Sequence, residues 1–488
     1  MLSSRDINIK EVIKVLSLLL IIEGFAIWLS VPVSLYYKDG DLFPIIYSGL
    51  ITAGLGSLGL LLTFWKTKKN HMGKREGFMI VSLAWIIFSI FGTLPFLLSG
   101  SIDNFTDAFF ETMSGFTTTG ASILNDIEAV PHGVLFWRSM THWIGGMGII
   151  VLSLAILPLL GVGGMQLFVA EVPGPVPDKL HPRITGTAKR LWGIYVLLTF
   201  VQTILLMFGG MSLFDALCHA FGTMATGGFS TQNASVADYS AYIQYVIIAF
   251  MFLAGMNFTL HYFALHGKLR KVWKNQEFRF YSSIILISTF IIATVLIFNM
   301  ETETEKAFRD SLFQVVSITT TTGFVSADYL IWPHFAWFII FLLMFTGGSA
   351  GSTGGGMKSI RLHLLFKAAA VHLRKMVHPR AFIPVRYNGH AVKDEIIFSI
   401  LSFGLFYILI FSMGAMLLSA MGLDFQSAIG ASIASLGNIG PGLGMVGPVE
   451  NYFEIPFMGK WLLSFLMLLG RLELFTVLVF LSPGFWKK

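Results

Sequence analysis

Four short segments of the chain share a pattern that could supply oxygen ligands to a cation. Each is a half-apolar stretch that ends in a polar run with glycine, and three of the runs also contain threonine. The segments read DAFFETMSGFTTTGAS, DALCHAFGTMATGGFS, DSLFQVVSITTTTGFVS and SAIGASIASLGNIGPG. A dehydrating cation needs oxygens in place of its water shell, and backbone carbonyls supply them when an extended chain points them to one axis. Glycine permits the positive φ angles that such a chain needs, and threonine adds a hydroxyl oxygen on a stiff stem.

The residues predicted to form this ring of oxygens come from all four segments. They are Thr118, Thr119, Gly120, Ala225, Thr226, Gly227, Thr321, Thr322, Gly323, Asn438, Ile439 and Gly440. Three segments open with an aspartate and a small residue, and each segment reaches its glycine twelve or thirteen residues after its start. A single Thr-Thr-Gly is more often an ordinary turn. Four such segments on one predicted side of the chain indicate an internal fourfold repeat.

The elements that must position these segments are membrane spans. The 488-residue chain is 55% hydrophobic and only 12% charged, whereas soluble domains carry about 25% charged residues. A helix needs about 20 apolar residues to cross the hydrocarbon core of a bilayer. Ten stretches are predicted to span: 12–36, 43–65, 78–99, 134–160, 191–210, 241–265, 281–299, 334–365, 396–420 and 460–482. The first of these is too long for the apolar part of a signal peptide.

Four shorter segments lie between pairs of these spans and predict re-entrant pore helices. They cover 104–117, 212–225, 307–320 and 424–437. Each helix would aim its partly negative C-terminal end at the cation. The expected fold is an all-α integral membrane protein with about ten transmembrane helices and four re-entrant pore helices, in which four span–pore helix–span repeats have a pseudo-fourfold arrangement.

The repeats define the expected domain boundaries. An N-terminal pair of transmembrane helices precedes them at 1–75. The four pore repeats are expected at 76–185, 186–275, 276–390 and 391–488.

Charges between the spans predict the orientation. Lysines and arginines crowd the loops around 66–75, 179–190, 268–279 and 367–393, all on one side of a ten-span chain with both termini inside. By the positive-inside rule this side is cytoplasmic. The opposite side, where the four short segments open, is rich in Asp and Glu and would attract cations. For any one of these acidic residues, a solvated surface is the simpler explanation.

The eighth predicted span is interrupted by the run GGSAGSTGGG. Inside a membrane such a run should unwind, and its free polar groups need a protein or water-filled surrounding. We interpret it as a movable barrier below the ring of oxygens, with close helix packing through small residues as the alternative. A phosphate-binding loop is disfavoured because the following lysine comes one residue late and no strand precedes the run. The predicted gate residues are Gly347, Gly348, Gly351, Gly354, Gly355 and Gly356.

The last predicted span contains a charged residue, Arg471, near Glu473. A charge at that depth is costly and usually faces a pathway or a partner. Arg471 is predicted either to line the pore near the glycine-rich run and limit cation passage, or to form a salt bridge with Glu473 or another buried carboxylate. Glu23 in the first span is similarly buried, and the repeat pattern predicts no role for it.

The sequence does not indicate an enzyme. His142, His219 and His261 are isolated and are predicted to be packed, hydrogen-bonded residues, and no nucleophile–base pair or metal motif is recognisable. The single cysteine, Cys218, excludes a disulfide framework and a multi-cysteine metal site. The net charge of +6 lies in short loops, so it indicates topology and not a nucleic-acid partner. No cofactor is expected apart from the transported ion.

Taken together, the four segments, the glycine-rich break and the C-terminal GRLELFTVLVFLSP resemble the Trk/Ktr/HKT superfamily of potassium transporters. The resemblance covers essentially the whole chain, and WIGGMGIIVL, AEVPGPV and GNIGPG are also similar to family stretches. Because of its extra N-terminal pair of spans, the chain is most similar to the ten-span bacterial Trk membrane subunits.

The resemblance implies a pseudo-fourfold pore within one chain. It also implies a homodimer with separate pores, regulated by cytosolic nucleotide-binding RCK-type (TrkA-like) subunits at the bacterial cytoplasmic membrane. All four filter glycines are present, which implies K⁺ selectivity, and the family's gate loop and pore arginine map to 347–356 and Arg471. The fourth filter segment, Gly437-Asn438-Ile439-Gly440, lacks threonine, so the fourfold symmetry of the site is expected to be imperfect.

The expected function is potassium uptake across the plasma membrane through a selective filter, gated by the glycine-rich loop and a cytosolic subunit. The alternative is a secondary transporter coupled to H⁺ or Na⁺, which alternates access around a midplane site. Four re-entrant segments on one side favour a continuous pore, because inverted repeats would place two segments on each side.

Overall fold

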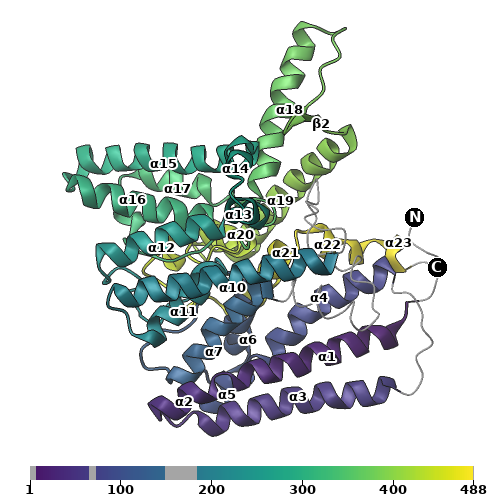
Figure 1. Cartoon of the computed structure of the whole chain (residues 1–488), viewed down its shortest axis with the longest axis vertical. Helices are drawn as coiled ribbons and strands as arrows, with labels where there is room; N and C mark the ends of the chain where they lie inside the picture. Colours follow the sequence, from purple (N-terminus) through teal and green to yellow (C-terminus); the bar gives the residue numbers. More distant parts are fainter. Residues whose placement is uncertain (1–6, 65–72, 149–183, 487–488) are drawn as a thin grey trace.

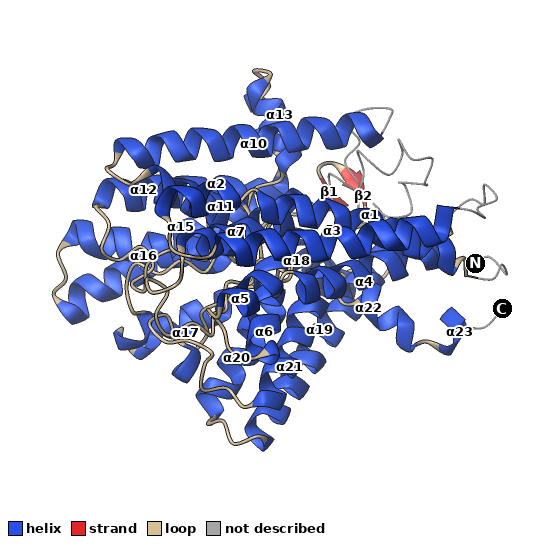
Figure 2. Ribbon diagram, turned by 90° about the horizontal axis from the view of Figure 1, so that it is seen from below, coloured by secondary structure: helices blue, strands red, loops and turns tan. Residues whose placement is uncertain are grey.

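The computed structural model describes residues 7–64, 73–148 and 184–486, and these residues are mostly helical. Long helices run alongside one another through the body of the molecule, and α18 projects beyond it (Figure 1). The strands in this part of the chain form one short hairpin (Figure 2), β1 (Arg386–Tyr387) and β2 (His390–Ala391). The predicted all-α class is therefore confirmed.

Two long helices pack side by side at the N-terminus, α1 (Ile9–Trp28) and α3 (Leu42–Phe64), and the short α2 (Val31–Tyr37) connects them (Figure 1). Small residues allow this close approach, because a Cβ atom on Gly24 would lie only 2.8 Å from Ala53. Small residues at helix contacts are typical of membrane proteins, where packing and not the hydrophobic effect drives association.

The first two predicted repeats each contain a long helix, a short buried helix and a second helix that leads back. In the first repeat these are α4 (Lys74–Phe91), α5 (Leu94–Ser99), α6 (Phe105–Phe116) and α7 (His132–Trp143), followed by a π-helical turn at Ile144–Gly148. In the second repeat they are α10 (Ile184–Phe208), α11 (Leu213–Met224), α12 (Ala241–Ala254), α13 (Phe258–Leu265) and α14 (Leu269–Lys274).

The last two predicted repeats follow the same order. The third contains α15 (Gln276–Met300), α16 (Thr304–Thr319), α17 (His334–Leu343) and α18 (Ser359–Val377). The fourth contains α19 (Asp394–Ala420), α20 (Phe425–Gly437), α21 (Phe457–Arg471), α22 (Phe475–Leu478) and α23 (Pro483–Trp486). The hairpin β1–β2 lies between these two repeats.

Six of the described helical segments are long and apolar enough to cross a membrane. They correspond to the predicted first, second, third, fifth, seventh and ninth spans. The predicted spans 241–265 and 460–482 are not straight: α12 and α13 meet at 104°, and the helices on either side of 472–474 meet at 106°. The predicted fourth span, 134–160, begins as α7, and its part beyond residue 148 lies outside the described residues.

In the first and fourth repeats, the helix that follows the pore helix loses regular α-helical geometry where it passes that pore helix. Glycine allows the close crossing: a Cβ atom on Gly145 would lie 2.0 Å from the carbonyl oxygen of Phe116, and one on Gly470 would lie 2.1 Å from that of Leu436. These carbonyls lie at the ends of α6 and α20. These two breaks therefore coincide with tertiary crossings, which the local sequence did not predict.

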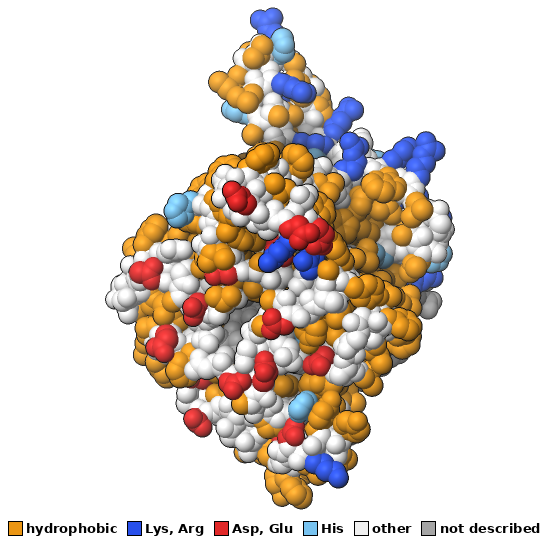
Figure 3. Space-filling model, turned by 90° about the vertical axis from the view of Figure 1, so that its left-hand side faces the viewer, with side chains coloured by type: hydrophobic (Ala, Val, Ile, Leu, Met, Phe, Trp, Pro, Cys, Tyr) orange, Lys and Arg blue, Asp and Glu red, His pale blue; other side chains and the backbone are white. Residues whose placement is uncertain are grey.

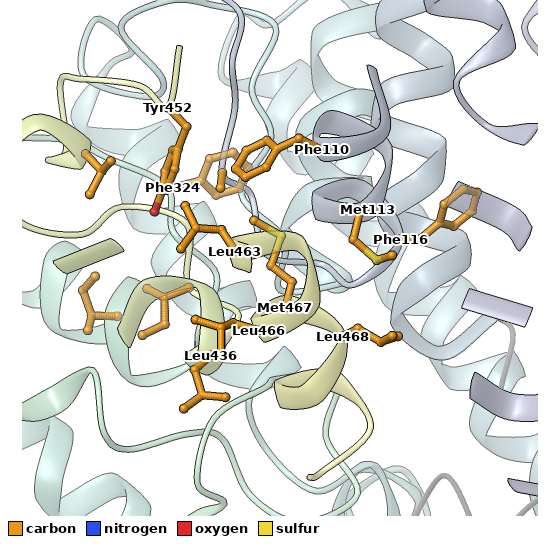
Figure 4. Packing of buried hydrophobic residues seen from close by; sticks show 14 of the residues in the cluster. Phe110, Met113, Phe116, Phe324, Leu436, Tyr452, Leu463, Leu466, Met467 and Leu468 are labelled. Atoms are coloured by element: carbon orange, nitrogen blue, oxygen red, sulfur yellow. The ribbon is translucent and has the colours of Figure 1, made fainter. Parts of the chain in front are cut away.

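Packed apolar side chains hold the pore helix of the first repeat, α6, against α21 of the fourth repeat. Figure 4 shows α6 residues facing α21 residues at the centre of the molecule. The ring of Phe109 on α6 stacks on Trp461 of α21 with centroids 4.8 Å apart, and Phe110 lies 5.4 Å from Tyr452. This cluster fixes α6 relative to α21, and so helps to fix the position of the run that follows α6.

Charged side chains separate between regions of the surface. Figure 3 shows Asp and Glu side chains spread over one face around a hollow, whereas Lys and Arg gather mainly beyond its upper edge and on the projecting part of the chain. This separation agrees with the predicted acidic and basic sides of the chain.

Candidate functional site

Four short helices, α6, α11, α16 and α20, converge in the interior and correspond to the predicted pore helices. Most of their residues are buried. At the start of three of them, the side chains of Asn104, Ser212 and Asp424 accept a hydrogen bond from a backbone N–H three residues later. Such a cap satisfies the free N–H groups of a helix start. Each helix is followed by one of the glycine-containing runs.

The backbone takes the same unusual path after every pore helix. One residue of each run has a left-handed conformation, with φ between 54° and 60°. These residues are Thr118, Thr226, Thr321 and Asn438. The N–H of the following residue then bonds back to the carbonyl five residues earlier at 2.8–2.9 Å, in all four runs. A left-handed glycine comes next in each run, at Gly120, Gly228, Gly323 and Gly440.

This register corrects the sequence prediction in the second repeat by one residue. Gly227 was aligned with Gly120, but Gly227 takes the place of Thr119, because its N–H makes the equivalent 2.8 Å bond back to the pore helix. Gly228, with φ of +80°, takes the place of Gly120. Ala225 is the residue that ends α11 and precedes the repeated path. Two adjacent glycines both permit the turn, so the local sequence did not distinguish them.

The four runs close into a ring. A Cβ atom built on each left-handed glycine would lie 2.0–2.7 Å from a backbone carbonyl oxygen of the next run. The pairs are Gly120 with Gly227, Gly228 with Thr322, Gly323 with Ile439, and Gly440 with Thr119. The structure thus brings all four predicted segments together, in chain order around a common centre. Closely spaced backbone oxygens of this kind are able to replace the hydration shell of a cation.

The fourth run joins the ring in a different way, because it lacks threonine. The side-chain amide of Asn438 donates to the hydroxyl of Thr119 at 3.0 Å and to the carbonyl of Met467 at 2.9 Å. The amide therefore links the fourth run to the first run and to α21. The predicted asymmetry of the site is present as a specific cross-link.

The glycine-rich run lies between two helices, as the predicted break requires. Helix α17 ends at Leu343 and α18 begins at Ser359. The run is bonded to the end of α12 in the second repeat, where the Ser349 N–H donates to the Gly255 carbonyl at 2.8 Å. The Ala350 N–H donates to the carboxylate of Glu277 at 2.7 Å. Of the predicted gate glycines, Gly351 is exposed and the other five, Gly347, Gly348, Gly354, Gly355 and Gly356, are buried.

The buried part of this run contacts the inner end of the ring. The Gly355 N–H donates to the hydroxyl of Thr321 at 2.7 Å. The hydroxyl of Thr226 lies 3.3 Å from that of Thr353, which also donates to the Met224 carbonyl at 3.0 Å. The gate residues and the ring residues predicted from sequence therefore meet directly.

Arg471 lies at the same inner end of the ring. Its guanidinium donates to the hydroxyl of Thr118 at 3.1 Å and to the carbonyl of Thr353 at 2.8 Å. It also donates to the carbonyls of Gly145 and Gly146 at 2.5 and 2.8 Å. These contacts join three repeats and agree with the hypothesis that Arg471 lies beside the pore near the glycine-rich run.

Glu473, the alternative partner considered for Arg471, binds another arginine. Its carboxylate accepts a hydrogen bond from the guanidinium of Arg361 near the start of α18. Both side chains of this pair are mostly buried, at 7% and 12% exposed. The pair connects the bend after α21 to the helix that follows the glycine-rich run.

Carboxylates on the outer loops are held in their ionised form by hydrogen bonds. The hydroxyl and N–H groups of Ser427 lower the pKa of Asp424 below its ordinary value. The side-chain amide of Asn233, 3.0 Å away, lowers the pKa of Asp126. These groups keep a negative potential near the entrance, which would attract cations.

A buried ion pair beside the ring was missed by the sequence analysis. Glu111 on α6 and Arg138 on α7 lie 2.7 Å apart, and their side chains are 0% and 2% exposed. The available signal was the presence of ionisable residues inside a predicted pore helix and a predicted span, where charges are rare and usually functional.

The isolated histidines behave as predicted, because all three are packed and hydrogen-bonded. His142 bonds to the Gly115 carbonyl at 2.7 Å, His219 to the Asp215 carbonyl at 2.7 Å, and His261 to the Leu253 carbonyl at 2.9 Å.

Comparisons with known proteins agree with this geometry. The family model TrkH, described as a cation transport protein, matches residues 51–488. The chain is 41% identical to the Trk system potassium uptake protein TrkH of Salmonella typhimurium, an alignment that covers 99% of this chain and 100% of the relative. It is 34% identical to the Trk system potassium uptake protein TrkG of Escherichia coli, over 95% of this chain and 97% of that protein.

A solved structure has the same fold. The crystal structure of the potassium transporter TrkH from Vibrio parahaemolyticus superposes with a TM-score of 0.88 and 37% sequence identity. The superposition covers 98% of this chain and 100% of that chain.

Proposed function

From the premise that the chain belongs to the TrkH family of cation transport proteins, we propose that it takes up potassium ions through the ring of four backbone runs. It is a multi-pass membrane protein, and the bacterial cytoplasmic membrane with both termini inside is the proposed location. The relatives' names as Trk system potassium uptake proteins support K⁺ as the transported ion.

The observation that supports this proposal most strongly is the closed ring itself. Each run repeats the same left-handed path, and each left-handed glycine abuts a carbonyl of the next run. We propose that the ion ligands come from Thr118-Thr119-Gly120, Thr226-Gly227-Gly228, Thr321-Thr322-Gly323 and Asn438-Ile439-Gly440. Four copies of one backbone path around one centre favour a continuous pore over the alternative of a coupled secondary transporter with inverted repeats.

The proposed gate is the glycine-rich run together with Arg471. Both lie at the inner end of the ring and bond to the hydroxyls of its threonines. A fixed positive charge beside a cation path raises the barrier to cations. Displacement of the run and of Arg471 would open the path toward the basic side of the molecule.

Partner proteins follow from the same family membership. The relatives belong to a Trk system, which implies a transporter with more than one component. We propose a homodimer in which each chain has its own pore, regulated from the cytosol by nucleotide-binding RCK-type subunits. The projecting helix α18 directly follows the proposed gate, so a subunit bound near it would be able to pull on the gate.

Ion flux into liposomes that contain the purified chain tests the proposed function. Uptake is compared for K⁺, Rb⁺, Na⁺ and Li⁺, and Gly120→Ser is measured alongside. We expect uptake of K⁺ and Rb⁺ with little Na⁺, and relaxed selectivity in the variant, because a side chain at Gly120 would displace the Gly227 carbonyl. Flux that ignores the identity of the cation, or that needs a second coupled solute, would contradict the proposal.

A further inference from the structure

The ion pair between Glu111 and Arg138 is one of the most completely buried polar features among the described residues. The Nε atom of Arg138 lies 2.7 Å from Oε1 of Glu111. Removing both charges from water is costly, and apolar side chains in their place are often as stable or more stable. A buried pair is therefore weak evidence for stability, and its other contacts indicate what it positions.

Glu111 holds the chain directly after the first run of the ring. Its Oε2 atom accepts a hydrogen bond from the Ile123 N–H at 2.9 Å, and Oε1 accepts one from the Ser122 hydroxyl at 2.9 Å. Both partners follow Gly120 within three residues. One carboxylate on the pore helix thus fixes where the first run turns outward.

Arg138 holds the equivalent point of the second run. Its Nη1 atom donates to the Ser230 carbonyl at 2.9 Å, and its guanidinium lies 3.6 Å from the centre of the Phe229 ring. Phe229 and Ser230 directly follow Gly228. The ion pair is therefore a continuous link from the exit of the first run to the exit of the second.

In two other repeats, the residue at the pore-helix position of Glu111 also bonds to the chain after the run, but it is a histidine or a glutamine in place of a carboxylate. His219 on α11 bonds to the Ser230 hydroxyl at 3.0 Å, and Gln314 on α16 donates to the Ala327 carbonyl at 3.0 Å. The fourth repeat has Ala431 at this position, and there the Tyr452 hydroxyl donates to the Gly440 carbonyl at 2.6 Å. Among these contacts behind the runs, the one in the first repeat is a charged pair, and Arg138 of that pair also bonds to the second repeat.

We propose that Glu111 and Arg138 are positioning residues for ion selectivity, which hold the outer ends of the first and second runs at the spacing that a dehydrated K⁺ requires. The inference rests on the proposed function, because it assigns the pair to the same ring. A carbonyl ring discriminates between cations only if the spacing and number of its oxygens are maintained. The pair acts on the carbonyls from behind and does not touch the ion.

A double substitution, Glu111→Leu with Arg138→Met, tests the proposal. It removes both charges together, so no buried charge is left unpaired and the fold is retained. The K⁺/Na⁺ flux ratio in liposomes is expected to fall about tenfold, the low end of what loss of an orienting contact behind a metal ligand costs. Total Na⁺ flux should rise, and Glu111→Gln should shift the ratio in the same direction.

The matched control is the buried pair of Lys460 and Asp107, which lie 2.6 Å apart. It also joins two repeats, but its described side-chain partners are Asn104 and the ring of Phe453, and no described hydrogen bond joins either side chain to the residues that directly follow the first two runs. Lys460→Met with Asp107→Asn should leave the K⁺/Na⁺ ratio within about twofold of the original protein, well short of the tenfold fall expected above.

Three outcomes would overturn the inference. An unchanged ratio in the Glu111/Arg138 double variant would show that the ring keeps its spacing without the pair. An equal fall in both double variants would show a general loss of packing. A chain without substitutions that passes Na⁺ as fast as K⁺ would contradict the proposed function itself, and that result is recognised before any variant is measured.

Discussion

The outer ring and the inner gate of the proposed pore are both irregular backbone inside a membrane protein, but they are held differently. The ring is built four times from the same left-handed path, and each copy bonds to its own pore helix. The glycine-rich run is a single copy from the third repeat. Part of its anchoring to the ring comes from side-chain hydroxyls, such as that of Thr321, and from Arg471.

This difference indicates which part is rigid and which part is able to move. In each run the left-handed glycine packs against a carbonyl of the next run, so a shift of one run needs a shift of all four. The run at 344–358 packs closely on the ring, and the described hydrogen bonds between them are few, each contributing about 0.5–1.5 kcal/mol. A partner that pulls on α18 would break those bonds before it distorted the ring.

The largest effect is expected where a substitution breaks the ring itself. Gly228→Ala places a Cβ atom 2.1 Å from the Thr322 carbonyl and puts a side chain in the left-handed region, which alone costs about 1–2 kcal/mol. The K⁺/Na⁺ flux ratio should fall by about tenfold or more, since 1.4 kcal/mol corresponds to a factor of ten.

The neighbouring glycine separates the two registers. Gly227→Ala meets the ring of His142 and not a carbonyl of the next run, so its ratio should fall less than that of Gly228→Ala. If the K⁺/Na⁺ ratio fell further in Gly227→Ala than in Gly228→Ala, the alignment of Gly227 with Gly120 predicted from the sequence would be correct after all.

The next largest effect is expected at the gate. Arg471→Ala removes charge-assisted hydrogen bonds to both the ring and the glycine-rich run, each worth about 1.5–3 kcal/mol. Basal K⁺ flux should rise about tenfold, and the K⁺/Na⁺ ratio should not change because the ring carbonyls stay in place. Shortening the run 347–356 should act in the same direction.

The matched control for Arg471→Ala is Arg309→Ala. It removes an arginine that pairs with Glu305, on the acidic side and away from the gate. If both arginine variants raised flux equally, or if Arg471→Ala changed selectivity, the separation of ring from gate would be wrong.

A smaller effect is expected from a single hydroxyl at the contact between ring and gate. Thr321→Val keeps the shape of the side chain but removes the acceptor for the Gly355 N–H. Loss of about 1 kcal/mol should raise basal flux about fivefold. Thr294→Val is the control, because its hydroxyl makes an exposed bond to the Phe290 carbonyl within α15. If flux in Thr321→Val were no higher than in this control, the Thr321 hydroxyl would not help to hold the proposed gate closed.

The smallest effect is expected at the water-exposed outer surface. The backbone N–H of His132 binds the carboxylate of Asp39 at 3.0 Å and lowers its pKa, and the imidazole ring adds a second bond at 2.6 Å. Stability from this contact is present above the ordinary pKa of 3.8 and is lost as the pH falls through the lowered value. Asp39→Asn should cost under about 1 kcal/mol at neutral pH.

Thermal unfolding in detergent from pH 7 to pH 3 measures this contact. The difference between Asp39→Asn and the original protein should shrink at the acid end, while the K⁺/Na⁺ ratio stays the same. A constant difference across the pH range would show that the carboxylate charge is not what stabilises the loop.

The sequence predicted the main elements because each depends on local chemistry. Long apolar stretches predict membrane helices, since an apolar side chain and an internally bonded backbone are what lipid requires. The glycine-rich run at 347–356 predicted its own break, because ten small residues do not maintain a helix. The pore helices were recognisable from half-length apolar stretches that end in polar runs.

Other features of the site depend on residues that are far apart in the chain. The choice of Gly228 over Gly227 is set by the carbonyl of Thr322 in the next repeat. The bend after Arg471, and the contacts of Arg471 with the first and third repeats, follow from the crossing of α21 over α20.

By itself, therefore, the sequence determined that this chain lies in a membrane, that it repeats one pore element four times and that its third repeat is broken by glycine. Those properties follow from the hydropathy and backbone freedom of contiguous residues. Only the tertiary structure decided the register of the ring, the partner of Arg471 and the pairing of Glu111 with Arg138. Each of these is a contact between separate elements of the fold, and its free energy depends on distances that no local segment contains.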